Sequence, residues 1–200
     1  SWDGSSWTEV NDLSTGRNSL AGDGSNNTDN LVSGGTTGSN SDATEEWTAP
    51  ATFRQFNIGD IYYNADPSSG VIKYSGYGTA TWSSGGSLNT ARFWSGGAGS
   101  LPAGLVFGGV PNTAVNESYN GTAWSETGDL NSVHGYTTGG GTQTAAICIA
   151  GYTPSVGDEV ETWDGSSWTE VSDIPTATAG VTSAGTSTSH IGVGGFNPTY

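Results

Sequence analysis

Apolar positions in this chain fall into short runs that alternate with polar residues, and glycine interrupts most windows long enough for a helix. Short alternating runs bounded by Gly, Asn, Asp and Ser are typical of β-strands, whereas no stretch keeps a 3.6-residue period. The clearest apolar strands end in small residues, as LVSGG (31–35), LVFGG (105–109), ICIAG (147–151) and IGVGG (191–195). We therefore expect an all-β protein.

A nine-residue phrase recurs in phase with these strands. Residues 2–10 and 163–171 both read WDGSSWTEV, and looser copies begin at Tyr119 (YNGTAWSET) and Tyr77 (YGTATWSSG). In every copy an aromatic residue precedes a tryptophan by five positions, with Asp-Gly or Asn-Gly between them in three copies. Such pairs favour type I′ hairpin turns, because both central residues need positive φ. Each repeat is therefore expected to hold four short strands, the content of a propeller blade.

The repeat is interrupted once. Trp82, Trp124 and Trp168 follow one another at intervals of 42 and 44 residues, but Trp7 precedes Trp82 by 75. Trp47 opens a unit in phase, yet the hairpin does not follow, and strands are expected instead at 61–64 and 71–75 around a turn at 66–70. Two interpretations stay open: an insertion or partial fifth blade within one ring, or a junction between one array ending near 56 and another beginning at 57.

The phrase WDGSSWTEV-x-DL, the stretch GGSLNTAR and the Gly-Gly strand endings resemble kelch-type repeats of the galactose-oxidase-like propeller family. They are most similar to the degenerate kelch-like arrays of marine bacteriophage virion and tail-fibre proteins. This resemblance implies a kelch-like β-propeller of four to five four-stranded blades over residues 1–200, with an inserted β-hairpin at about 48–76. The units are about 1–46, 77–118, 119–162 and 163–200, and 47–76 is an insert or partial blade. The N-terminal strands are expected to complete either the C-terminal blade or the blade of a neighbouring copy.

The charge balance narrows the choice of partners. Four Lys and Arg residues stand against nineteen Asp and Glu residues, a net charge of −15. We therefore expect no binding to nucleic acid, whose phosphates attract basic proteins. No apolar run reaches the roughly 18–20 residues of a membrane span, so no membrane insertion is expected. Cys148 is the only cysteine, and we expect it to act as a small buried apolar residue.

Motifs for metal or cofactor chemistry are missing from the sequence. A galactose-oxidase site needs two Tyr and two His ligands for copper and a Cys–Tyr crosslink. His134 and His190 are the only histidines, and the only cysteine, Cys148, lies in the apolar strand 147–151. The segment 23–29 places oxygen ligands at alternate positions, as calcium loops do, but it aligns with plain turns elsewhere in the repeat. The acidic stretches 42–46 and 158–161 are interpreted as solvated loop charge. We expect no catalytic residue, metal site or cofactor, with weak Ca²⁺ binding as an alternative.

A sialidase-like glycoside hydrolase is the lesser alternative. The stretches at 1–7 and 162–168 resemble the sialidase Asp-box, although they are one residue short between Asp and Gly. That chemistry requires three arginines converging on a carboxylate, beside a Tyr/Glu nucleophile pair. The chain offers only Arg17, Arg54 and Arg92 for this role. Ten residues after their tryptophans, Arg17, Arg92 and His134 occupy equivalent repeat positions, which favours structural roles.

The function expected from these features is that of a non-enzymatic structural or adhesion module, extracellular or on a virion. It forms part of a phage-type fibre or appendage that recognises surface glycans or builds the fibre. The expected partners are further copies of the chain, other fibre or virion proteins, and host-surface polysaccharide. A self-assembling filament subunit without any ligand is the main alternative. The candidate ligand-binding residues are Tyr62, Tyr63, Tyr74, Tyr77, Trp94, Arg17, Arg92 and His134.

Overall fold

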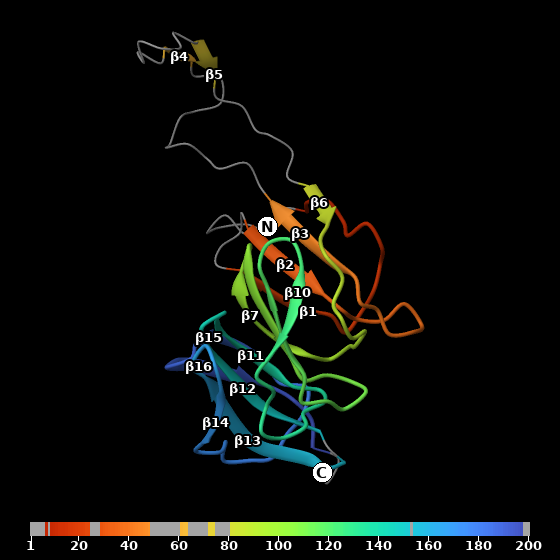
Figure 1. The fold of residues 1–200 in the computed structure, drawn as a ribbon, viewed down its shortest axis with the longest axis vertical. Helices are drawn as coiled ribbons and strands as arrows, with labels where there is room; N and C mark the ends of the chain where they lie inside the picture. Colours follow the sequence, from red (N-terminus) through yellow and green to blue (C-terminus); the bar gives the residue numbers. More distant parts are fainter. Residues whose placement is uncertain are drawn as a thin grey trace.

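The computed structural model describes residues 7, 9–24, 29–48, 61–63, 72–74, 81–152 and 154–197. Within these ranges every regular element is a β-strand, so the expectation of an all-β protein is confirmed (Figure 1). A membrane-crossing helix, long and apolar enough for the purpose, is not found in this part of the chain.

Twelve of the strands form three antiparallel sheets of four, in which consecutive strands are neighbours except that β6 lies next to β3 in the first sheet. Sheet I contains β1 (Ala21–Gly24), β2 (Asp29–Ser33), β3 (Thr44–Thr48) and β6 (Thr81–Ser84). Sheet II contains β7 (Gly96–Ser100), β8 (Ala103–Phe107), β9 (Asn116–Tyr119) and β10 (Trp124–Thr127). Sheet III contains β11 (Thr138–Thr142), β12 (Ala145–Tyr152), β13 (Val156–Trp163) and β14 (Trp168–Val171). Sheet IV has only β15 (Thr182–Thr186) and β16 (Ser189–Val193), and the whole is compatible with a propeller-like fold.

The interruption of the repeat lies inside sheet I. Trp47 on β3 pairs with Trp82 on β6, just as Trp163 pairs with Trp168 in sheet III. Residues 49–80 therefore connect the third and fourth strands of one sheet. Within them β4 (Ile61–Tyr63) and β5 (Ile72–Tyr74) form an antiparallel pair, within the ranges where the sequence predicts strands. Tyr77, the leading aromatic that the repeat assigns to Trp82, lies outside the described residues.

The turns between the third and fourth strands differ from the type I′ turns that the sequence predicts. Only the glycines, Gly121 and Gly165, have positive φ (91° and 97°), and the preceding Asn120 and Asp164 do not. Asn120 instead accepts hydrogen bonds at its side-chain oxygen from the backbone N–H groups of residues 122 and 123. Asp164 does the same for residues 166 and 167. The prediction was wrong because the loop has four residues, and an Asx side chain stabilises it in place of a second positive φ.

The first strands of the four sheets lie side by side. β1 packs on β7, β7 on β11, and β11 on β15, so the order of the sheets in the chain is also their order in space (Figure 1). These strands are rich in glycine, which lets their neighbours approach closely. A Cβ atom added at Gly140 on β11, for example, would lie 2.7 Å from the Cε1 atom of His190 on β16.

The contacts between sheets I and II and between sheets II and III set apolar side chains of one sheet against an aromatic pair of the next. Leu105 and Phe107 of sheet II pack against Trp163 and Trp168 of sheet III, and the rings of Phe107 and Trp168 lie 4.9 Å apart. Leu31 of sheet I meets the aromatic pair of sheet II, Tyr119 and Trp124, in the same way. Because each sheet buries one face against the next, the core is divided among the contacts between sheets, as in other repeat proteins.

The Gly-Gly endings of the second strands hold each sheet to the segment that leads into the next one. Gly34 and Gly108 have φ of 68° and 62°, and a Cβ atom on them would lie 2.5 Å from the Arg92 carbonyl oxygen and 2.6 Å from that of His134. The following glycine donates its N–H to that same carbonyl, at 2.7 Å from Gly109 to His134. In sheets I and II glycine therefore suits both the backbone conformation and the space at this position.

Candidate functional site

A buried glutamate on the third strand of each complete sheet receives the linker that leads into that sheet. In sheet II, Glu117 accepts hydrogen bonds from the backbone N–H and the side-chain amide of Asn89, both at 2.8 Å. Arg92 contributes an ion pair to it at 3.0 Å between NH2 and Oε1, and both side chains are completely buried. Glu45, Glu117 and Glu161 occupy equivalent positions, two residues before the leading aromatic, and we call them the clasp glutamates.

Sheet III repeats this arrangement with a histidine. Glu161 accepts from the backbone N–H groups of Asn131 (2.8 Å) and Ser132 (3.0 Å), and its Oε1 lies 3.3 Å from His134 Nε2. His134 Nδ1 lies 3.0 Å from the carbonyl oxygen of Ala150. Both ring nitrogens therefore lie within hydrogen-bond distance of an acceptor oxygen.

In sheet I the donors to the clasp glutamate are Ser14 and Arg17. Glu45 accepts from the backbone N–H and hydroxyl of Ser14 and from Arg17 NH1, all at 2.8 Å. Burial raises the pKa of Glu45, but the bonds from Ser14 and the charge of Arg17 outweigh it, so the pKa lies below its usual value. Burial likewise acts against the hydrogen bonds to Glu161, and its pKa is also lowered.

These contacts account for three of the residues that the sequence analysis proposed as ligand-binding. Arg17, Arg92 and His134 each bind the clasp glutamate of a different sheet, so the structure does not bring them into one pocket. The acidic stretches 42–46 and 158–161 are not simply solvated loop charge, because Glu45 and Glu161 are 3% and 1% exposed. The sequence does carry a signal for them: a Glu stands two positions before an aromatic residue in three repeats.

Trp94 lies on a groove that all four first strands border, which we call the aromatic groove. Its ring centroid is 3.8 Å from that of Tyr136, and 37% of its surface remains exposed. Phe196, half-exposed at 47%, packs on the other side of Tyr136. The groove has a volume of about 610 Å³, and its remaining lining is mostly Gly, Ser and Thr. The sequence analysis missed Tyr136 and Phe196. Tyr136 occupies the repeat position of Trp94, in the linker, and Phe196 directly follows the Gly-Gly ending of the last repeat.

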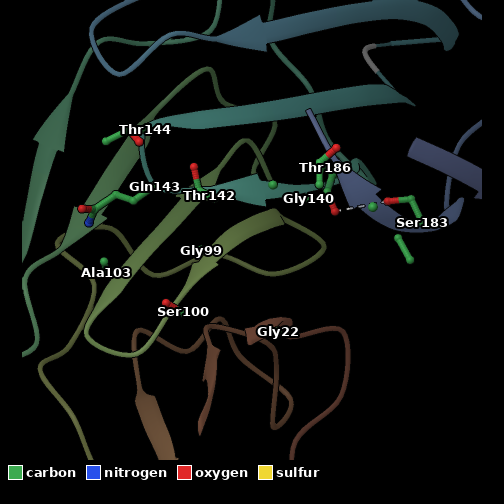
Figure 2. A pocket seen from close by; sticks show the side chains of 14 residues that line it. Gly22, Gly99, Ser100, Ala103, Gly140, Thr142, Gln143, Thr144, Ser183 and Thr186 are labelled. Atoms are coloured by element: carbon green, nitrogen blue, oxygen red, sulfur yellow. Dashed lines mark hydrogen bonds between the residues drawn. The ribbon is translucent and has the colours of Figure 1, made fainter. Parts of the chain in front are cut away.

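A second groove, of about 590 Å³, lies at the other end of the same strands and is lined by backbone and hydroxyl groups. Figure 2 shows Ser100, Thr142 and Thr144 around it, together with glycines of β7 and β11. Gln143 lines it too, but its side-chain amide is bound to the carbonyl oxygens of Gly104 and Tyr119 in sheet II. The Gln143 side chain thus serves the contact between sheets II and III. None of the described residues that line this groove has an exposed aromatic ring, in contrast to the aromatic groove.

The remaining candidates from the sequence are partly outside the described residues. Tyr62 and Tyr63 belong to β4 and Tyr74 to β5, but the structure describes only their backbone. Arg54 and Tyr77 lie outside the described residues. The segment 23–29, which the sequence analysis compared with a calcium loop, joins the paired strands β1 and β2, and residues 25–28 within it are not described.

Among the described residues, no group of three or more His, Cys, Asp or Glu side chains is arranged to hold a metal ion. Cys148 is fully buried, and burial raises the pKa of its thiol to about 12. This placement agrees with the small apolar role expected from the sequence. The chain matches no protein-family model, and no curated protein shows significant similarity to it.

Proposed function

We propose that the chain is a non-enzymatic binding module with a kelch-like propeller architecture, and that it recognises a carbohydrate in the aromatic groove. The observation that carries this proposal is the exposed Trp94 ring, held against Tyr136 at a groove lined by small hydroxyl residues. An aromatic face stacks on the apolar face of a sugar, while hydroxyl and backbone groups satisfy its hydroxyls.

The charge of the groove selects a neutral sugar. Among the described residues that line it there is no Asp, Glu, Lys or Arg. An acidic sugar has no cation to pair with there, and the net charge of −15 repels it. The ligand is therefore a neutral oligosaccharide, as found in surface polysaccharides.

A glycosidase is less well supported by the same residues. General acid–base or nucleophilic work needs titratable side chains at the bound substrate. In sheets I to III the clasp glutamates and their Arg or His partners are buried between strand and linker, away from both grooves. The extracellular or virion setting, in a fibre or appendage, follows from the resemblance to phage arrays and belongs to this proposal.

The test is a glycan array of neutral and acidic oligosaccharides, followed by titration calorimetry with the neutral oligosaccharide bound most strongly. Trp94→Ala is expected to weaken binding about tenfold, since it removes the stacking ring. Val133→Ala, a change of an exposed residue outside the groove lining, is the control and should leave affinity unchanged. Binding that survives Trp94→Ala, a preference for acidic glycans, or released hydrolysis products would contradict the proposal.

A further inference from the structure

One repeat position, two residues before the first strand of each sheet, has a left-handed backbone in all four repeats. Its φ angles in sheets I to IV are 55°, 52°, 53° and 64°, at Ser19, Trp94, Tyr136 and Gly180. This conformation favours glycine, because a Cβ atom comes too close to the following carbonyl oxygen. Three of the four repeats nevertheless have a side chain there, and two of these side chains are large rings.

Main-chain contacts hold this position whatever its side chain. The residue before it forms an isolated β-bridge in every repeat, as Phe93 does with Val110. Gly180 has the same backbone conformation with no side chain at all. The conformation therefore does not depend on the rings of Trp94 and Tyr136. Residues that keep an unfavourable backbone conformation are concentrated at binding sites, so these rings are candidates for a role in recognition.

The rings at this position stack in a row that stops at sheet I. Trp94 lies on Tyr136 with 3.8 Å between the ring centroids and 31° between the planes. Phe93 meets Trp94 obliquely, at 48° and 4.8 Å, and 37% of the surface of Trp94 stays exposed. The next member of the row on the side of sheet I is Ser19, whose carbonyl oxygen accepts a hydrogen bond from the Trp94 N–H at 2.8 Å.

The small side chain of Ser19 leaves a place beside Trp94 that a ring would otherwise fill. β1 packs on β7 as β7 packs on β11, so a side chain at Ser19 is related to Trp94 as Trp94 is to Tyr136. The lining of the aromatic groove continues from Trp94 to Leu20 and Ala21, directly after Ser19. We call the place between Ser19 and Trp94 the slot. Its width of one stacked ring suits a single sugar unit, whose apolar face packs on an aromatic ring.

We propose that Ser19 determines the specificity of the aromatic groove, and that one unit of the neutral oligosaccharide occupies the slot. This inference rests on the proposed function and adds to it the place where the sugar stacks. The Ser19 hydroxyl donates to Asn18 Oδ1 at 3.2 Å, which leaves its oxygen free to accept from a sugar hydroxyl. A larger side chain at Ser19 excludes the sugar by filling the slot.

Titration calorimetry with the neutral oligosaccharide selected on the glycan array tests the slot. Ser19→Tyr is expected to weaken binding at least about tenfold, because its ring stacks on Trp94 in place of the sugar. Tyr136 has the same backbone conformation, so this variant should fold, and denaturant titration checks that it does. Ser19→Leu fills the slot without a ring and should weaken binding too. Ser19→Gly, the matched control, keeps the slot open and should lose no more than about threefold, the worth of one hydrogen bond.

The outcomes separate this inference from the proposed function. If Trp94→Ala weakens binding but Ser19→Tyr and Ser19→Leu do not, the groove binds the sugar outside the slot, and only the inference is wrong. Tighter binding by Ser19→Tyr would mean that the sugar stacks along a lengthened row of rings, which also contradicts the slot. A wild type that binds no neutral glycan would overturn the inference and the proposed function together.

Discussion

In sheets II and III the linker is held by a glutamate at the same strand position, but a different side chain donates to that glutamate. In sheet II the donor is Arg92, whose Nε and NH1 find no hydrogen-bond partner within the described part of the chain. In sheet III it is His134, and both of its ring nitrogens lie within bonding distance of acceptors. The repeat therefore requires a donor for a buried carboxylate rather than a particular side chain, but the two solutions differ in cost.

Burial of the Arg92 charge is the main difference. Burial lowers the pKa of the Arg92 guanidinium, and the charges of Glu117, Glu126 and Asp129 act in the opposite direction. Arginine nonetheless stays protonated in proteins, so sheet II contains a buried cation that depends on its glutamate. In sheet III the donor is an imidazole, which unlike a guanidinium also has a neutral form.

The largest effect is therefore expected for Glu117→Gln. It leaves the Arg92 cation buried without its counter-charge, and we expect the free energy of unfolding to fall by about 3–5 kcal/mol. Denaturant titration measures this. Glu170→Gln on β14, which changes an exposed glutamate, should stay within about 0.5 kcal/mol of the wild type. Equal stability of the two variants would mean that the Arg92–Glu117 pair does not hold the linker.

The sequence predicts contacts between residues that are close together in the chain better than contacts between distant residues. The strand content and the pairs Tyr119/Trp124 and Trp163/Trp168 follow from local spacing, and the structure pairs both. The partner of Trp82 was missed because Trp47 lies beyond an insertion, and only the ladder between β3 and β6 reveals it.

The clasp and the groove were harder to predict from the sequence for a physical reason. An acidic residue in a strand is ordinarily exposed, so the sequence predicts solvated charge at Glu161, whereas its hydrogen-bond donors come from another segment of the chain. The groove combines Trp94 with Tyr136, two residues of different repeats that the packing of β7 on β11 brings together. Contacts between repeats carry no spacing signal within a repeat.

A second difference between sheets II and III lies at the end of the second strand. Sheet II has Gly108 with φ of 62°, whereas sheet III has Ala150 with φ of 55° at the equivalent place. We expect Gly108→Ala to lower the free energy of unfolding by about 2–3 kcal/mol. The left-handed conformation disfavours a side chain by about 1–2 kcal/mol, and the new Cβ would press on the His134 carbonyl oxygen.

Ala150→Gly is the matched control for that variant, again by denaturant titration. It relieves backbone strain but removes a buried methyl group, so we expect a net change of less than about 1 kcal/mol. If Gly108→Ala lowers the free energy of unfolding no more than Ala150→Gly does, the space around the two positions is equivalent. The contact with the linker would then not require the Gly-Gly ending.

The smallest effect is expected for Glu161→Gln, at about 1–2 kcal/mol. The variant loses charge-assisted hydrogen bonds from Asn131, Ser132 and His134 but leaves no obligatory buried cation. Its pH dependence gives the sharper measurement. Because the folded pKa of Glu161 lies below the ordinary 4.5, its stabilising contribution is present above that value and is lost as the pH falls through the folded pKa. The wild type should therefore lose more stability than Glu161→Gln on acidification below 4.5, while Glu45, whose pKa is also lowered, keeps the variant sensitive to acid. Identical slopes in the two proteins would mean that the Glu161 carboxylate gains nothing from its donors, and that sheet III is held by packing alone.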